Sequence, residues 1–188
     1  MIRIKEMTRL AHRYLADFVT EGDLVIDATA GNGYDTICLA ELVGSAGHVY
    51  AFDIQRKALE NTRHKLVEKK LSNRVTLIEA GHEMLDQHVK GQLSAVIYNL
   101  GYLPGGDKQL TTDHLTTLTS IEKAIKRLLT GGIVVVVVYP GHSEGLIEKQ
   151  VLLKFCRSLP SSKFSVLHTR LCNQAHNPPE LLIIQSID

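Results

Sequence analysis

The feature that most limits the fold of this chain is an alternation of short, continuously apolar segments with longer amphipathic ones. The central apolar segments, 94–99 and 133–139, are rich in valine and isoleucine and nearly free of charge. Strands buried on both faces of a parallel sheet have this composition, whereas half-exposed strands alternate apolar and polar residues. The sequence therefore predicts strands over 24–28, 48–53, 74–79, 94–99, 133–139, 164–170 and 180–186.

The segments between these strands carry apolar residues at helical spacing. Gly131 is placed to end one of them as a C′ glycine, while Ser143 starts another and Pro160 stops it. Strand–helix alternation of this length predicts a doubly wound α/β sheet. Only nine residues, LCNQAHNPP, separate the last two strands, so these should form an antiparallel hairpin. Helices are predicted over 6–19, 55–70, 113–129 and 143–158.

Length, charge and cysteine content narrow the functional class. The 188 residues suit one domain, 1–188, and a net charge of +1 excludes a strongly basic nucleic-acid arm but not a local basic patch. The three cysteines, Cys38, Cys156 and Cys172, are far apart and show no CxxC spacing, which argues against a disulfide framework or a metal site. The charged N-terminus is neither a signal peptide nor an anchor, and the longest apolar run is too short to span a bilayer. These features predict a cytoplasmic protein without a membrane partner.

The segment VIDATAGNGYDT, residues 25–36, leads from the first strand into a helix. Gly31 and Gly33 permit positive φ and close approach of a ligand to the backbone, and Asp35 and Thr36 can cap the helix start. Alone, this could be a plain glycine turn. Asp53, which ends the second strand about 20 residues later, is placed to bind ribose hydroxyls. The pair predicts a site for an adenosine-type nucleotide.

Two residues argue against a dinucleotide as the ligand. The last glycine of the G-x-G-x-x-G fingerprint, which lets helix and strand pack closely, is replaced by Thr36. Asp27 lies within the strand ahead of the glycines, and a buried carboxylate there suits a cationic ligand better than a pyrophosphate.

On these residues the sequence resembles the class I methyltransferases that use S-adenosylmethionine (SAM). The motif of an acid, three residues and Gly-x-Gly is matched by Asp27, Gly31 and Gly33, and the ribose acid by Asp53. The resemblance implies a Rossmann-like sheet of seven mostly parallel strands in the order 3-2-1-4-5-7-6, with helices on both faces. It also implies that Gly81 and His82 lie against adenine, although His82 could simply neighbour a helix N-cap. The implied SAM-binding residues are Asp27, Thr29, Ala30, Gly31, Asn32, Gly33, Asp35, Thr36, Asp53, Ile54, Gln55, Gly81, His82, Asn99 and Leu100.

The segment NLGYLPGGDK, 99–108, follows the fourth strand, where the methyl acceptor should meet the cofactor. Amino-methylating enzymes carry Asn/Asp-Pro-Pro-aromatic there. Asn99 and Tyr102 keep the amide and the aromatic at that spacing, while both prolines are replaced. Asn99 can accept a hydrogen bond from an amino nitrogen, and Tyr102 can stack on a base. The alternative is that Asn99 caps the strand and Tyr102 packs in the core.

NLGYLPGGDK, YPGH and NPPELLII together resemble a narrower family, small bacterial proteins labelled rRNA methylases (the YtqB-like group). The resemblance implies methylation of 5-aminomethyl-2-thiouridine at the wobble position, with a tRNA anticodon stem-loop as partner. An rRNA or small-molecule acceptor, a nicotinamide-dependent oxidoreductase and a non-catalytic SAM-binding scaffold stand as alternatives. The oligomeric state, a homodimer included, is left open.

An alkylamine acceptor has a pKa of about 10 and must lose a proton before it reacts. Asn99 cannot take that proton, so the candidates are Asp107, His142 and His176. Asp107 could instead form a loop ion pair with Lys108. Basic residues that could contact RNA phosphates, or simply form solvated helix faces, are Arg3, Lys5, Arg9, Arg13, Arg157, Lys163 and Arg170.

Overall fold

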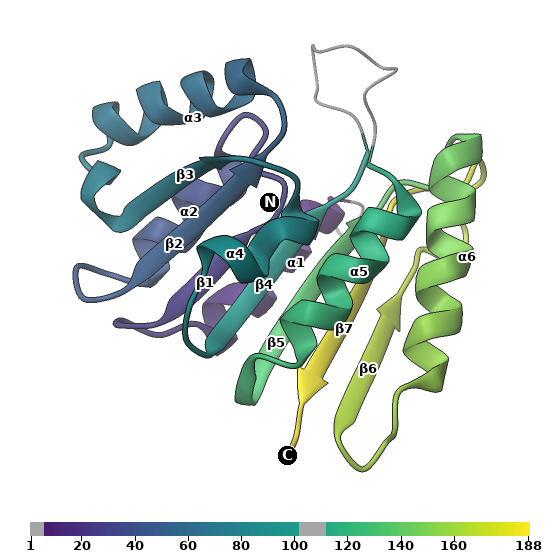
Figure 1. Cartoon of the computed structure of the whole chain (residues 1–188). Helices are drawn as coiled ribbons and strands as arrows, with labels where there is room; N and C mark the ends of the chain where they lie inside the picture. Colours follow the sequence, from purple (N-terminus) through teal and green to yellow (C-terminus); the bar gives the residue numbers. More distant parts are fainter. Residues whose placement is uncertain (1–5, 102–111) are drawn as a thin grey trace.

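The computed structural model describes residues 6–101 and 112–188, which form one seven-stranded sheet in the order β3-β2-β1-β4-β5-β7-β6 (Figure 1). The pairs β3–β2, β2–β1, β1–β4 and β4–β5 are parallel, and β7 pairs antiparallel with both β5 and β6. Both the predicted order and the terminal hairpin are therefore confirmed. The strands are β1 (Leu24–Asp27), β2 (His48–Asp53), β3 (Val75–Glu79), β4 (Leu93–Asn99), β5 (Leu128–Val138), β6 (Phe164–Thr169) and β7 (Glu180–Ser186).

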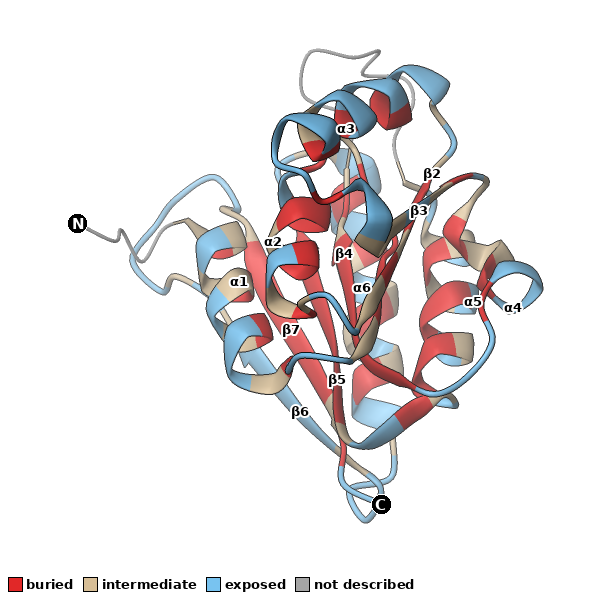
Figure 2. Cartoon of the chain, turned by 90° about the vertical axis from the view of Figure 1, so that its left-hand side faces the viewer, coloured by how far each residue is buried: buried red, intermediate tan, exposed pale blue. Residues whose placement is uncertain are grey.

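Helices cover both faces of the sheet, with α4, α5 and α6 on one face and α1, α2 and α3 on the other (Figures 1 and 2). The α-helices are α1 (Met7–Phe18), α2 (Tyr34–Leu42), α3 (Arg56–Glu68), α4 (Leu85–His88), α5 (His114–Ile125) and α6 (Ser143–Ser158). Two 3-10 turns, η1 (Ser72–Arg74) and η2 (His82–Met84), flank β3. None of the helices in the described ranges is both long and apolar enough to cross a bilayer.

The apolar strands supply two separate cores because successive side chains of a strand point to opposite faces. In β5, Val134 and Val136 pack with the α4–α5–α6 side, and Val135 and Val137 pack with the α1–α2–α3 side. All four are at most 1% exposed. This is why residues 133–139 show no polar alternation in the sequence.

The predicted helix 113–129 is wrong at its C-terminal end. Helix α5 stops at Ile125, and β5 begins at Leu128, which pairs with Leu93 of β4. Gly131 has φ +86° inside β5, next to an irregularity in the β4–β5 register, and is not a helix C′ residue. The apolar spacing of this stretch continues from the helix into the strand, so periodicity alone could not locate the boundary.

The glycine turn after β1 depends on the absence of a side chain at Gly33. Its φ is +82°, and a Cβ atom there would lie 2.7 Å from the Thr62 hydroxyl oxygen on α3. We expect Gly33→Ala to lower the free energy of unfolding by about 2 to 3 kcal/mol, because backbone strain and a steric contact add. Gly22→Ala is the matched control, since Gly22 has φ +95° and open space around it. Urea unfolding of both variants measures the difference, and equal losses would show that the contact with Thr62 contributes nothing.

Candidate active site

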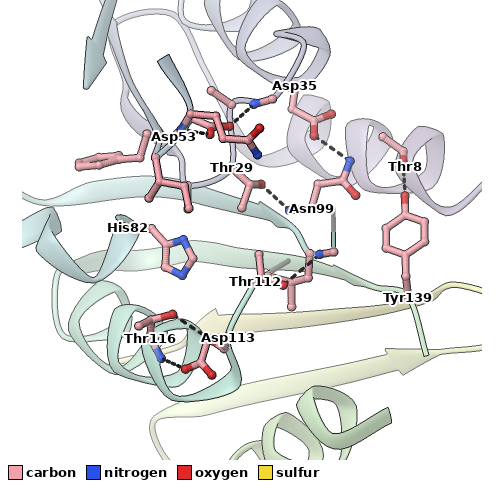
Figure 3. Close-up of a pocket in the computed structure, with 18 of the residues that line it drawn as sticks. Thr8, Thr29, Asp35, Asp53, His82, Asn99, Thr112, Asp113, Thr116 and Tyr139 are labelled. Atoms are coloured by element: carbon pink, nitrogen blue, oxygen red, sulfur yellow. Dashed lines mark hydrogen bonds between the residues drawn. The ribbon is translucent and has the colours of Figure 1, made fainter. Parts of the chain in front are cut away.

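A cavity of about 1200 Å³ opens at the carboxyl ends of the parallel strands. Segments after β1, β2, β3, β4 and β5 line it, together with α1 and residues 176–179 of the β6–β7 connection (Figure 3). The cavity spans the boundary between β1 and β4, where the strand order reverses, which is the usual ligand position in an open α/β sheet.

Asp27 stabilises the glycine turn through hydrogen bonds and does not line the cavity. Its side chain is fully buried, and its carboxylate accepts hydrogen bonds from the Thr29 N–H at 3.1 Å and the Thr36 hydroxyl at 2.5 Å. Burial raises its pKa, with the nearby Asp35 charge acting in the same direction. Thr36 and Asp35 lie in the first turn of α2, whose N-cap is Gly33, so the prediction that they cap this helix is wrong.

Asp53 is anchored at the end of β2 by the backbone on both of its oxygens. Oδ2 accepts from the Gly31 N–H and Oδ1 from the Gln55 N–H, each at 2.8 Å. Burial raises the pKa of this carboxyl, while both backbone hydrogen bonds oppose that rise. Because a carboxylate has about four acceptor positions, Asp53 keeps lone pairs that can take ribose hydroxyls.

His82 supports the fit of an adenine ring to this half of the cavity. Its ring lines the cavity, is buried, and packs edge-to-face on Tyr98 with centroids 5.6 Å apart. Burial lowers the pKa of His82, so the ring is neutral at physiological pH. No described residue supplies a hydrogen-bond partner to its buried Nε2, which a heterocyclic ligand could do.

Twelve of the 15 predicted cofactor residues line the cavity, and three do not. Those outside it are Asp27, Gly33 and Thr36, which shape the turn. The twelve that line it are Thr29, Ala30, Gly31, Asn32, Asp35, Asp53, Ile54, Gln55, Gly81, His82, Asn99 and Leu100.

Asn99 ends β4 at the centre of the cavity wall, and two neighbours hold it. Its backbone N–H donates to the Thr29 hydroxyl at 2.7 Å, and its side-chain Nδ2 donates to Asp35 Oδ2 at 3.1 Å (Figure 3). Nearby, the Gly101 N–H donates to the Thr112 hydroxyl and the Thr112 N–H to the Gly101 carbonyl, and the Thr112 hydroxyl donates to the buried Glu148. Tyr102 and Asp107, both predicted as catalytic, lie outside the described residues.

His142 lines the cavity but also caps helix α6. Its Nδ1 accepts the Gly145 N–H at 3.1 Å, so this nitrogen's lone pair is engaged and unavailable to a substrate proton. Helix α6 starts at Ser143, as predicted, and His142 is its N-cap. His176, the other histidine candidate, lines the cavity with φ +64° and stays a candidate base.

Sequence reasoning missed the part of the cavity formed by α1. Thr8 lines this side, and its hydroxyl lies 3.3 Å from that of Tyr139 in the segment after β5 (Figure 3). His12, also on α1, contacts Asp35 through Nε2 at 2.5 Å. No local motif marks Thr8 or His12, because α1 reaches the cavity only through its packing on the sheet.

Fold and site together define a class I SAM-dependent methyltransferase. Residues 49–185 match the family model described as "Putative rRNA methylase", and the chain belongs to this family. Residues 2–86 also match the model of protein-L-isoaspartate(D-aspartate) O-methyltransferase.

Solved structures and a curated relative agree with that assignment. The chain superposes on a protein of Clostridium thermocellum described as a "putative rRNA-methylase", with a TM-score of 0.96 and 46% identity over 99% of this chain and 100% of that one. It also superposes on a Streptococcus mutans "putative methyltransferase" in complex with SAH (TM-score 0.89, 37% identity, 99% of both chains). The tRNA (mnm(5)s(2)U34)-methyltransferase of Arabidopsis thaliana is 36% identical over 93% of this chain and 67% of that protein.

The comparisons also exclude one of the alternative functions. The match to a methyltransferase family, and to a solved structure that holds SAH, excludes the nicotinamide-dependent oxidoreductase.

The Arabidopsis relative is chloroplastic, so the cytoplasmic location stays a prediction. Among the described residues no group of three His, Cys, Asp or Glu side chains could hold a metal ion.

Proposed function

We propose that this protein methylates tRNA at the wobble uridine, converting 5-aminomethyl-2-thiouridine to its 5-methylaminomethyl form. The observation that carries the proposal is that the cavity has two halves, which meet at Asn99. The cofactor half contains Asp53 and His82, and the acceptor half is lined by Thr8, Tyr139, Gly141 and residues 176–179. This second half offers polar groups and an amide to an amine-bearing base. The 36% identical relative is named for the same uridine.

The chain's own groups account for positioning, which supplies much of the rate of a bimolecular transfer. When bound, SAM would supply an electrophilic methyl group on its sulfonium and would leave as SAH, and the half of the cavity that would hold it is lined by Gly31, Asp53 and His82. Asn99 orients the neutral amine by accepting one of its N–H bonds. The product forms as a secondary ammonium that loses its proton to solvent.

RNA access is supported by an exposed aromatic at the cavity rim. Tyr34 lines the cavity and is 67% exposed, and the Lys65 ammonium lies over its ring, 3.8 Å from the ring centroid. Single-stranded loops are commonly bound by aromatic stacking together with a few cations. Arg9, one of the predicted phosphate contacts, forms a salt bridge with Glu6 at 2.8 Å on α1.

Nucleoside mass analysis tests the proposal. The enzyme and SAM are incubated with tRNA whose wobble uridine stops at the 5-aminomethyl-2-thio stage, with rRNA, and with a free alkylamine. We expect the tRNA nucleoside to gain the mass of one methyl group, with no gain when SAM is omitted. Methylation of the rRNA or free amine with unchanged tRNA would contradict the proposal and favour that alternative substrate.

A further inference from the structure

We propose that His12 and Asp35 are positioning residues for the methyl acceptor, acting together through Asn99. This inference rests on the proposed transfer to an amino nitrogen. Asp35 lies in the first turn of α2 with only 6% of its side chain exposed, and its two oxygens have different partners: Nε2 of His12 from α1 and Nδ2 of Asn99 from β4. Three elements distant in sequence thus meet at one carboxylate.

The carboxylate decides which way the Asn99 amide faces. An ionised carboxylate only accepts hydrogen bonds, so the Asn99 NH₂ group must face Asp35 and the amide oxygen must face elsewhere. The cavity lies beside Asn99, and Figure 3 shows the amide nitrogen directed at Asp35 and the oxygen away from it. Held in this way, the oxygen is an acceptor for an amine N–H, and the amine lone pair is left free to react.

His12 supplies the charge that balances Asp35. Hydrogen bonding to Asp35, then to Cys38, raises the pKa of His12 to about 10 against the cost of burial. A histidine pKa raised in this way keeps the pair ionised at neutral pH, and the pair is lost only as pH rises through about 10. His12 is therefore not a general base near pH 7, because it already carries its proton.

The balanced charge matters for an amine substrate. A lone carboxylate behind Asn99 would stabilise the acceptor as an ammonium, which has no lone pair to react. The His12 cation offsets that effect. Other titratable groups facing the pair are Asp27 on β1, Cys38 on α2 and Tyr139 after β5, and burial is the main cause that raises the pKa of both Asp27 and the Tyr139 phenol.

The test compares His12→Gln with wild type in the pH dependence of kcat at saturating tRNA and SAM. Gln keeps an N–H donor for Asp35 and removes the charge. We expect the rising limb of kcat, which reports the bound amine, to move up by about one pH unit, because one nearby cation is lost. The Kd of SAH, measured by calorimetry, should change less than about twofold, since the cofactor half keeps Asp53 and His82. His64→Gln on exposed α3 is the matched control and should match wild type in both measurements.

A second measurement requires no turnover. In ¹⁵N-labelled wild-type protein, the His12 ring should stay protonated to about pH 10, and Asp35→Asn should return its titration toward the ordinary value near 6.5. An ordinary His12 titration in wild type would overturn the inference, as would a His12→Gln rising limb that coincides with wild type. Weakened SAH binding with an unmoved limb would assign the pair to the cofactor and also overturn it. A wild-type enzyme inactive on the aminomethyl nucleoside would instead defeat the proposed function, while the NMR titration still tests the pair.

Discussion

Asn99→Ala is expected to lower kcat about a hundredfold while leaving SAH affinity nearly unchanged, because it removes the group that aims the acceptor. The substitution spares the local backbone. The Asn99 N–H still donates to the Thr29 hydroxyl and the Leu100 N–H to the Val137 carbonyl. Asp35 also keeps His12 as a partner, so no buried carboxylate is left alone.

Single-turnover methylation and SAH calorimetry separate the two effects of this substitution. Asn73→Ala, at an exposed asparagine of η1 outside the cavity, is the matched control and should behave as wild type. A kcat within threefold of wild type for Asn99→Ala would contradict the positioning role. The amide would then serve only to end β4, the alternative that the sequence left open.

Asp53→Ala is expected to weaken SAH binding about a hundredfold, because hydrogen bonds to a charged group contribute about 1.5 to 3 kcal/mol each. Two causes act in the same direction. The ribose loses its acceptor, and the backbone N–H groups of Gly31 and Gln55 lose the partner that holds the two turns together.

Glu79→Ala is the control matched to Asp53→Ala in charge and position. Glu79 is the register partner of Asp53 on the neighbouring strand β3, but its side chain is exposed and does not line the cavity. Calorimetric titration of both variants with SAH gives the comparison. Equal affinities would show that a carboxylate at the end of β2 is not a ribose ligand here. Asp53→Asn, which retains one acceptor oxygen, should fall between wild type and Asp53→Ala.

The cofactor half of the site could be predicted from the sequence because its parts are local. A glycine turn acts on the backbone within a few residues, and Asp53 follows directly at the end of the next strand. Asp27 shows the limit of such reasoning. It belongs to the sequence motif, but its contacts with Thr29 and Thr36 show that it supports the turn from outside the cavity.

The acceptor half could be predicted only in part, because its residues come from both ends of the chain. The segment after β4 was identified from its motif, and His142 from its position after β5, yet the cap contact with Gly145 could not be seen in the sequence. Thr8 and His12 belong to a helix whose apolar face, Met7, Ala11 and Leu15, explains only its packing on the sheet.

By itself, the sequence determined the sheet, its antiparallel terminal hairpin and the nucleotide turn, because hydrophobic periodicity and glycine conformation act over neighbouring residues. Only the tertiary structure decided which charges meet. Packing α1 beside α2 brings His12 to Asp35, and the parallel pairing of β1 with β4 places Asn99 within reach of the same carboxylate. Such contacts join residues 23 and 64 positions apart, and a hydrogen bond depends on distances of a few tenths of an ångström that no spacing in the chain specifies.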